Sequence, residues 1–388
     1  MTIYQNTKKF TIYKLIKELK KFVFQNQITN NKPVISKNDF KYLKKSISNL
    51  EISSYGYFTR LFEKKIQKFT KSKFVLCTNS GTSALHLSLL TLDINKDHEV
   101  FLPSFNFVSS ANAIRYCGAT PHFLDIEPEN LSVDPKKMNI YIKRQFFFKK
   151  GKLINKKTKK HLKAIILVYA YGHPPKMDEL LMICKKYNIK VIEDSAEALG
   201  SLYKKKHAGT FGDFGVLSFN GNKIITTGAG GAILTNSKIL YEKVKALATL
   251  AKNKSKIYNY TSVGYNYRMA SINASLGLSQ LKDVNRRILK RRKLYENYNK
   301  LFSKVNGMIL FSEPKNAKSN YWSQLLILKS EYKDKRTNIL NKLNKNKIES
   351  IQGWNLLNNL NYLKKFPKSD LSNSKKISKT IINLPSLN

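Results

Sequence analysis

One lysine stands in a loop of small residues in the stretch Ser218-Phe219-Asn220-Gly221-Asn222-Lys223-Ile224-Ile225-Thr226-Thr227-Gly228-Ala229-Gly230-Gly231, between apolar runs at 214–218 and 232–235. Another apolar run ends in Glu193-Asp194, and Asp194 lies 29 residues before Lys223. A lysine amine can form a Schiff base with an aldehyde, and a carboxylate can keep a pyridinium nitrogen protonated. The pair therefore indicates a pyridoxal-phosphate site. A surface lysine in a lysine-rich chain is the alternative.

Short apolar runs alternate with helical spacing from residue 74 to residue 235. We expect strands at 74–78, 99–102, 120–124, 164–169, 190–193, 214–218 and 232–235, and helices at 83–92, 109–116 and 177–187. This alternation predicts an α/β fold with a mostly parallel sheet covered by helices. Ligands of such sheets bind at the carboxyl ends of the strands, which is where Asp194 is expected.

The pattern predicts three regions along the chain. We expect an N-terminal helical segment at 1–50, a large cofactor-binding domain at 51–260 and a smaller C-terminal α+β domain at 261–388. The third region is expected because long helices, the clearest at 286–302, follow the alternating part.

Two segments depart from the alternation. Residues 141–163 contain Phe146-Phe147-Phe148 and a basic run, which predicts an inserted hairpin or loop. Residues 13–22 are charged and amphipathic, which predicts a peripheral helix, with a membrane-surface helix as the alternative. The longest apolar run, 164–171, is far shorter than the roughly 20 residues that cross a membrane, so we expect no membrane span.

The chain of 388 residues has a net charge of +45. Its lysines are scattered in pairs along nearly every segment, together with many Asn and Ile, which is typical of a compositional bias in the coding DNA. A nucleic-acid or anionic-membrane surface is the alternative, and we expect no specific nucleic acid partner. Cys77, Cys117 and Cys184 are widely spaced in apolar segments, which favours buried, reduced thiols in a cytoplasmic protein.

A second candidate site is Ser80-Gly81-Thr82-Ser83-Ala84-Leu85, which joins a predicted strand to a predicted helix. Free N–H groups and hydroxyls at a helix start bind anions, and a cofactor phosphate is a natural occupant. A plain capped helix start is the alternative.

With these motifs the chain resembles the DegT/DnrJ/EryC1/StrS family of pyridoxal-phosphate-dependent nucleotide-sugar aminotransferases. The resemblance extends from about residue 51 to the C-terminus and rests on six co-linear blocks: Asn79-Ser80-Gly81-Thr82-Ser83-Ala84-Leu85, Pro103-Ser104-Phe105-Asn106-Phe107-Val108, Glu193-Asp194-Ser195-Ala196-Glu197-Ala198-Leu199-Gly200, Gly209-Thr210-Phe211-Gly212-Asp213, residues 218–231, and Gly264-Tyr265-Asn266-Tyr267-Arg268-Met269. It implies the aspartate-aminotransferase-like fold of type I pyridoxal-phosphate-dependent transferases. It also implies a homodimer with shared active sites.

The resemblance assigns roles to individual residues and none to a metal. Lys223 would carry the cofactor and Asp194 would face its ring nitrogen. The remaining cofactor contacts would be Phe107 on the ring, Glu197 near the ring hydroxyl, Thr82, Ser83 and Ser218 on the phosphate, and Asn266 on the phosphate from the neighbouring subunit. His173 would lie near the sugar, and Arg268 would bind the diphosphate unless it forms a structural ion pair.

The resemblance is greatest to the legionaminic-acid and bacillosamine branch. It predicts amination of a nucleotide-linked 4-keto-6-deoxy sugar, most simply a UDP-linked N-acetylhexosamine, with L-glutamate as the donor. A sugar dehydratase of the same fold and a non-catalytic basic binding protein are the alternatives. Lys223 argues against the dehydratase, because dehydratases that abandon the Schiff base have His there. An intact Lys223 and Asp194 argue against the binding protein. Gln352-Gly353-Trp354 departs from the family's Arg-Pro before a tryptophan, and Ala229 replaces a commoner Glu or Gly.

Overall fold

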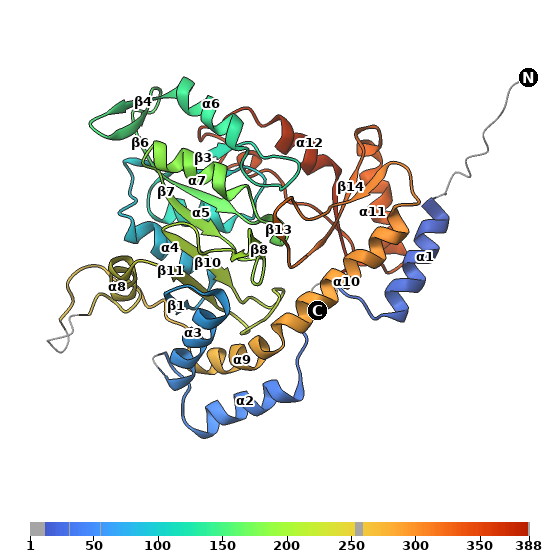
Figure 1. Ribbon diagram of the computed structural model, residues 1–388, viewed down its shortest axis with the longest axis horizontal. Helices are drawn as coiled ribbons and strands as arrows, with labels where there is room; N and C mark the ends of the chain where they lie inside the picture. The colour runs from blue at the N-terminus through green and yellow to red at the C-terminus, as the bar shows by residue number, and fades with distance from the viewer. Residues whose placement is uncertain (1–11, 31, 55, 253–258, 387–388) are drawn as a thin grey trace, which may run out of the picture.

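The computed structural model describes residues 12–386 except 31, 55 and 253–258. At its centre is a nine-stranded sheet (Figure 1). The strand order is β1-β11-β10-β7-β6-β2-β3, and the β4–β5 hairpin joins the sheet through β6. The strands are β1 (Phe74–Thr78), β2 (His98–Pro103), β3 (Thr120–Leu124), β4 (Phe146–Lys149), β5 (Lys152–Asn155), β6 (His161–Val168), β7 (Lys190–Asp194), β10 (Phe214–Ser218) and β11 (Gly231–Thr235).

The central sheet is mostly parallel. β10, β7, β6, β2 and β3 run in one direction, and β11 is antiparallel to both of its neighbours. Parallel strands need long crossovers, which helices supply here. The predicted α/β fold is confirmed, and the strands expected at 74–78, 120–124 and 214–218 have the expected bounds.

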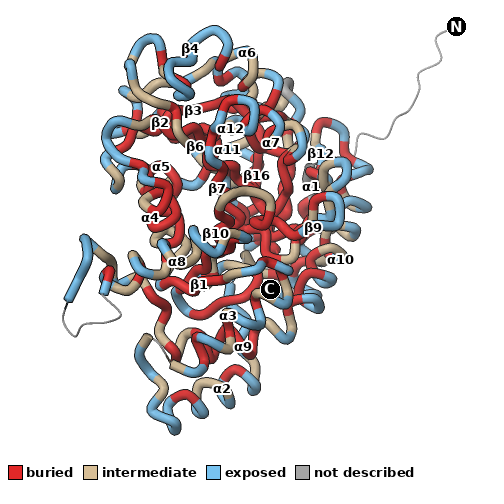
Figure 2. The backbone as a smooth tube through the Cα atoms, turned by 60° about the vertical axis from the view of Figure 1, so that its left-hand side comes forward, coloured by how far each residue is buried: buried red, intermediate tan, exposed pale blue. Residues whose placement is uncertain are grey.

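Helices cover both faces of this sheet. One face packs against α3 (Tyr57–Thr70), α4 (Gly81–Thr91) and α5 (Ser109–Tyr116), and the other against α6 (Pro135–Gln145) and α7 (Met177–Lys186). β6 contributes to both interfaces: Ile166 packs on the first side, and Ile165 and Leu167 on the second. Consecutive strand residues point to opposite faces, so burial on both sides explains the unbroken apolar run in this strand. Figure 2 shows the buried residues gathered along these central strands.

The inserted segment forms the predicted hairpin, but its predicted bounds were too wide. Tyr141 belongs to α6 and Lys163 to β6. Lys150 and Gly151 connect β4 to β5, and both have positive φ angles, as a tight two-residue hairpin turn requires. Asp134 caps α6 by accepting the N–H of Lys137 at 3.0 Å.

A second, antiparallel sheet lies toward the C-terminus in the order β12-β14-β16-β15. Its strands and nearby helices are β12 (Met308–Leu310), β14 (Gln324–Leu328), β15 (Ile351–Gln352), β16 (Ile381–Leu384), α10 (Val284–Phe302), α11 (Arg336–Lys345) and α12 (Ser372–Thr380). The other elements include α2 (Lys37–Ser48), α8 (Lys238–Leu247), α9 (Ser271–Lys282) and a three-stranded sheet of β13 (Ala317–Lys318), β8 (Leu202–Tyr203) and β9 (Lys206–His207). The domain boundaries stay predictions.

The predicted peripheral helix is α1 (Ile12–Gln25). Its Ile16, Leu19 and Val23 are buried in one cluster with residues of α10 and the second sheet. Its apolar face is therefore covered by protein, which argues against the membrane-surface alternative for this helix. Within the described residues no helix is both long and apolar enough to cross a membrane.

The three cysteines form no disulfide. Cys77 and Cys184 are buried, whereas Cys117 is only partly buried, contrary to the prediction for that residue. Burial raises the pKa of the Cys117 and Cys184 thiols to about 12, so both are protonated at neutral pH.

Candidate active site

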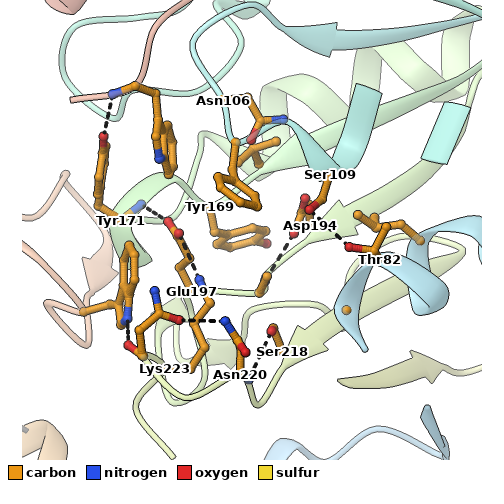
Figure 3. Close-up of a pocket in the computed structure, with 18 of the residues that line it drawn as sticks. Thr82, Asn106, Ser109, Tyr169, Tyr171, Asp194, Glu197, Ser218, Asn220 and Lys223 are labelled. Atoms are coloured by element: carbon orange, nitrogen blue, oxygen red, sulfur yellow. Dashed lines mark hydrogen bonds and ion pairs between the residues drawn. The ribbon is translucent and has the colours of Figure 1, made fainter. Parts of the chain in front are cut away.

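A cavity of about 550 Å³ opens at the carboxyl ends of β6, β7 and β10 (Figure 3). Its lining from the central sheet and the loops beyond it includes Ser80, Gly81, Thr82, Asn106, Phe107, Ser109, Tyr169, Tyr171, Asp194, Glu197, Ser218, Asn220, Asn222 and Lys223. Trp322, Ile351, Gln352, Trp354 and Asn383 line it from the C-terminal part of the chain. The cavity is therefore at the edge of the sheet where the strand pattern predicted a ligand.

Lys223 enters the cavity from the loop after β10. Its Nζ donates to Glu197 Oε1 at 3.1 Å and lies 4.1 Å from the ring centroid of Trp322. The Trp322 indole N–H donates to the Asn222 carbonyl at 2.8 Å, so one ring contacts both the lysine amine and the adjacent backbone. Burial raises the pKa of Glu197, although the Lys223 charge opposes that shift. The lysine side chain is only 13% exposed, which is unlike a surface lysine.

Glu193 and Asp194 end β7 and point to opposite sides, as consecutive strand residues do. Asp194 lines the cavity, and its Oδ2 accepts the Ser110 hydroxyl at 2.6 Å. Glu193 accepts the N–H groups of Gly209 and Gly212 at 2.9 and 2.7 Å, which fixes that loop. Burial raises the pKa of both carboxyls. Of this acidic pair, only Asp194 faces the cavity.

The start of α4 borders the cavity as an anion site. Ser80 caps the helix. The Thr82 hydroxyl donates to the hydroxyl of Ser109, the first residue of α5, at 3.1 Å. Two helix starts therefore meet here, and their free N–H groups and dipoles favour a negative charge. A Cβ on Gly81 would lie 3.1 Å from the Ser218 Cβ, so the glycine keeps this space open.

This geometry agrees with the comparisons with known proteins. Residues 33–388 match the model of the DegT/DnrJ/EryC1/StrS aminotransferase family. The chain belongs to this family. GDP-perosamine synthase of Escherichia coli O157:H7 is 34% identical over 314 residues, which cover 80% of this chain and 81% of that protein. UDP-4-amino-4,6-dideoxy-N-acetyl-beta-L-altrosamine transaminase of Campylobacter jejuni (serotype O:23/36) is 33% identical over 279 residues, 71% of this chain and 70% of that protein. A DegT DnrJ EryC1 StrS aminotransferase from Brucella abortus has the same fold, with a TM-score of 0.83 at 23% identity over 90% of both chains.

As a DegT/DnrJ/EryC1/StrS family member, the chain is a pyridoxal-phosphate-dependent sugar aminotransferase. The residues around the cavity fit that cofactor. Lys223 offers a nearly buried amine, Asp194 offers a carboxylate, and the space over Gly81 suits a phosphate. Phe107 lines the cavity with 56% of its surface exposed, which leaves a ring face free for stacking.

Two residues of the last family motif lie outside the cavity of their own chain. Arg268 Nη1 donates to Glu63 Oε1 at 2.8 Å, and both side chains are largely buried. This is the structural ion pair that was the alternative for Arg268, so the structure argues against a diphosphate contact. Asn266 is exposed and forms an isolated antiparallel β-bridge with Thr249. Its contact with a cofactor in the neighbouring subunit stays a prediction.

The structure also separates His173 and Ser83 from the cavity. His173 is fully buried, with its Nδ1 2.9 Å from the Ser319 hydroxyl and its ring between Phe311 and Tyr321. It does not line the cavity, so the structure does not support its expected position near the sugar. Ser83 turns its hydroxyl to the hydroxyl of Ser80 at 2.8 Å, inside the helix start, and does not line the cavity.

On the aromatic side of the cavity, Trp354 was named through the family motif, but Tyr171 and Trp322 were not predicted as lining residues. Tyr171 stacks on Trp354, with ring centroids 4.2 Å apart and an interplanar angle of 14°, and on Trp322 at 6.1 Å and 19°. Tyr171 lies two residues from His173, so attention to that loop could have found it. Nothing local marks Trp322, because its role depends on its contact with the distant Lys223.

Proposed function

We propose that this aminotransferase aminates C4 of a nucleoside-diphosphate-linked 4-keto-6-deoxy sugar, with L-glutamate as the donor, for surface-glycan biosynthesis. The observation that carries the proposal is the meeting of the Lys223 amine and the Asp194 carboxylate in one cavity beside a helix N-terminus. A cytoplasmic location stays a prediction.

Pyridoxal phosphate, when bound, supplies an aldehyde that accepts the amino group and a ring that withdraws electrons. Nζ of Lys223 is the base that removes and returns a proton at the reacting carbon, and it must be uncharged to do so. Glu197 Oε1, 3.1 Å away, is the acceptor placed to take the ammonium proton, and burial raises its pKa toward that role. Asp194, held by Ser110, is the carboxylate for the ring nitrogen.

The substrate side of the cavity supports a sugar of mixed polarity. The rings of Tyr171 and Trp354 offer apolar surface for C–H groups and a 6-methyl group. Gln352 and Asn383 place amide side chains on the same lining, and amides can bond to hydroxyl or acetamido groups. A largely apolar pocket with a few polar groups is typical of small-molecule sites.

We propose a UDP-linked N-acetylhexosamine as the sugar nucleotide. The inserted hairpin and the Asn220-Gly221-Asn222 approach to Lys223 support that branch through the resemblance. A GDP-linked sugar without an acetamido group is the second candidate, because the GDP-perosamine synthase match covers more of the chain than the match to the UDP-named transaminase.

The test compares kcat/KM for UDP-linked 4-keto-6-deoxy-N-acetylhexosamine with the values for GDP-linked and dTDP-linked 4-keto-6-deoxy sugars that lack the acetamido group. Glutamate is the donor in each assay. We expect the UDP sugar to be preferred by about tenfold or more, because unmet amide groups in the site would penalise the others. A preference for the GDP sugar would select the second candidate. A single half-reaction with glutamate, which forms one 2-oxoglutarate per cofactor, with none of the three sugars accepted, would remove the substrate proposal and leave the enzyme class intact.

We further propose a homodimer in which Asn266 completes the neighbouring subunit's site. Mixing inactive Lys223→Ala chains with inactive Asn266→Ala chains should restore part of the activity, because one hybrid site then carries neither change. No recovery in hybrids that demonstrably form would argue that Asn266 acts elsewhere.

A further inference from the structure

The β4–β5 hairpin, residues 146–155 and here called the basic hairpin, contributes nothing to the cavity. It joins the sheet through the pair Ile154 and His161, at the first residue of β6. The cavity lies at the opposite, carboxyl end of the same strand, where Val168 and Tyr169 line it. Figures 1 and 2 both show β4 at the periphery of the molecule. A partner bound to the basic hairpin would therefore leave the cavity open.

A buried polar network fixes the base of the basic hairpin. Glu99 is completely buried in β2 and accepts Asn155 Nδ2 at 3.0 Å and the Thr158 hydroxyl. Its other contact is His122 Nδ1 at 2.8 Å. An unbonded carboxylate in that position would be costly, so these bonds tie the turn after β5 to the sheet. Phe146, which is also buried, anchors the first strand. The basic hairpin is thus a firmly held projection.

The outer part of the basic hairpin combines cations with exposed aromatic rings. Phe147 is 39% exposed and Phe148 is 51% exposed. The basic hairpin contains three lysines and no Asp or Glu, and residues 143–163, which extend into its flanks, contain ten Lys and Arg and no Asp or Glu. Lys149, Lys150 and Lys152, in and beside the turn, are exposed and form no ion pair with any carboxylate of the described residues. This segment therefore presents uncompensated positive charge beside apolar surface.

The arrangement of the two rings favours a lipid surface over other anionic partners. Adjacent residues of a strand point to opposite sides, so Phe147 and Phe148 flank the hairpin. Phe148 rests against Tyr187 at 5.9 Å between centroids and still exposes half its surface. A nucleobase or a protein groove would cover one ring, whereas a lipid interface surrounds a penetrating tip and covers both. The same hairpin of a second copy is disfavoured as the partner, because it would bring the like charges of Lys149, Lys150 and Lys152 together.

We propose that the basic hairpin docks the enzyme on anionic lipid surfaces. The phenylalanines enter the boundary between headgroups and acyl chains, and the lysines of the turn meet the headgroups. The two attractions act together, which membrane anchoring by a small element requires. This inference is independent of the sugar substrate and does not rest on the proposed function.

The experiment is co-sedimentation of the full-length holoenzyme with vesicles of phosphatidylcholine alone, or with about one third phosphatidylglycerol. We expect binding to the anionic vesicles only, with a steep decrease as salt increases. The double variant Phe147→Ser/Phe148→Ser should lower the partition coefficient by about tenfold, and the triple variant Lys149→Gln/Lys150→Gln/Lys152→Gln by about tenfold or more. Both variants should keep wild-type turnover, because none of these residues lines the cavity.

Two matched controls separate docking from the general basicity of the chain. Lys375→Gln/Lys376→Gln/Lys379→Gln removes three exposed charges from α12, and Leu289→Ser/Ile309→Ser removes two exposed apolar side chains elsewhere. Both should bind anionic vesicles nearly as well as the wild type. Equal losses in the controls and the hairpin variants would overturn the proposal in favour of non-specific charge.

A depth measurement completes the test. In the Phe147→Trp variant, the fluorescence of the new tryptophan should shift to the blue on anionic vesicles and be quenched by brominated acyl chains. The wild type, which contains Trp322 and Trp354, gives the background fluorescence to subtract. If the variant binds the vesicles but its new tryptophan is not quenched, the proposed insertion of the hairpin into the lipid is wrong. A different result would be that a single-stranded oligonucleotide displaces the protein from the vesicles while the phenylalanine variants bind the vesicles as well as the wild type. That result would instead assign the basic hairpin to nucleic acid.

Discussion

The two walls of the cavity differ in how they are built. The wall from the central sheet, here called the polar wall, carries the charged side chains of the lining, and its Asp194, Ser218 and Lys223 lie at strand ends or in the loops that follow them. The opposite wall is rich in aromatic and amide side chains, with Trp322 and Trp354 from the C-terminal part of the chain. The polar wall holds charges close to their hydrogen-bond partners, which suits the cofactor. The aromatic wall offers shape and apolar surface, which suits selection of a sugar.

Removing Lys223 should have the largest effect. Lys223→Ala is expected to lower turnover by about a thousandfold or more, because the chain loses the proposed proton-transfer base and the proposed point of covalent attachment. The assay is glutamate-dependent transamination, together with the visible colour of the purified protein. Lys206→Ala, which changes an exposed lysine of β9, is the matched control. Borohydride fixation of the cofactor to a peptide without Lys223 would contradict the assignment.

Asp194→Asn tests whether the polar wall works through charge. The amide keeps the size of the side chain but not its charge, so we expect a loss of about 2–4 kcal/mol of transition-state stabilisation. Glu193→Gln is the informative comparison, because that side chain faces the Gly209 loop and not the cavity. It should instead lower the free energy of unfolding by about 1–3 kcal/mol. Near-normal turnover in Asp194→Asn would mean that another group faces the ring nitrogen.

His173, which packs among the rings of Phe311 and Tyr321, should make stability depend on pH. Burial lowers its pKa to about 3, whereas an unfolded histidine has a pKa of about 6.5. Between these values the unfolded state binds more protons, so stability is complete above about pH 6.5 and decreases as the pH falls toward 3. At pH 5 the loss from this group is roughly 2 kcal/mol.

Urea unfolding of the wild type and His173→Gln at pH 7 and pH 5 measures this contribution. The variant should lose less stability between the two pH values, whatever its stability at pH 7. An equal loss in both proteins would assign the pH dependence to other groups, such as the buried His207, whose pKa burial lowers to about 4.

Trp322→Phe should have the smallest effect on activity. Trp322 belongs to the aromatic wall and contacts Lys223 of the polar wall. The substitution keeps an aromatic face over Lys223 but removes the N–H bond to the Asn222 carbonyl. We expect kcat to decrease about three- to tenfold, with KM nearly unchanged, since one hydrogen bond contributes about 0.5–1.5 kcal/mol. Trp354→Phe, on the sugar side, should change KM for the sugar nucleotide more than kcat.

Acetic anhydride labelling of Lys223 in the cofactor-free protein gives an independent check on Trp322. Trp322→Leu removes the cation–π contact as well and should make the amine react faster than in Trp322→Phe. Equal labelling rates in all three proteins would mean that the ring does not position the lysine.

Much of the polar wall was predictable because its determinants are local. Strand ends at Asp194 and Ser218 follow from short apolar runs, and the start of α4 follows from the residues of Ser80-Gly81-Thr82. The sequence could not separate Glu193 from Asp194 by chemistry, since both are carboxylates. The strand geometry separates them, because adjacent side chains face opposite ways.

The sequence by itself determined the α/β alternation, the lysine–carboxylate pair and the family. These features depend on residue type and spacing within a few turns or strands. Only the tertiary structure placed Trp322 over Lys223, paired Arg268 with Glu63, buried His173 and put the basic hairpin opposite the cavity. Each of these facts depends on contacts between residues far apart in the chain. Packing of the whole core selects such contacts, and no local pattern encodes them.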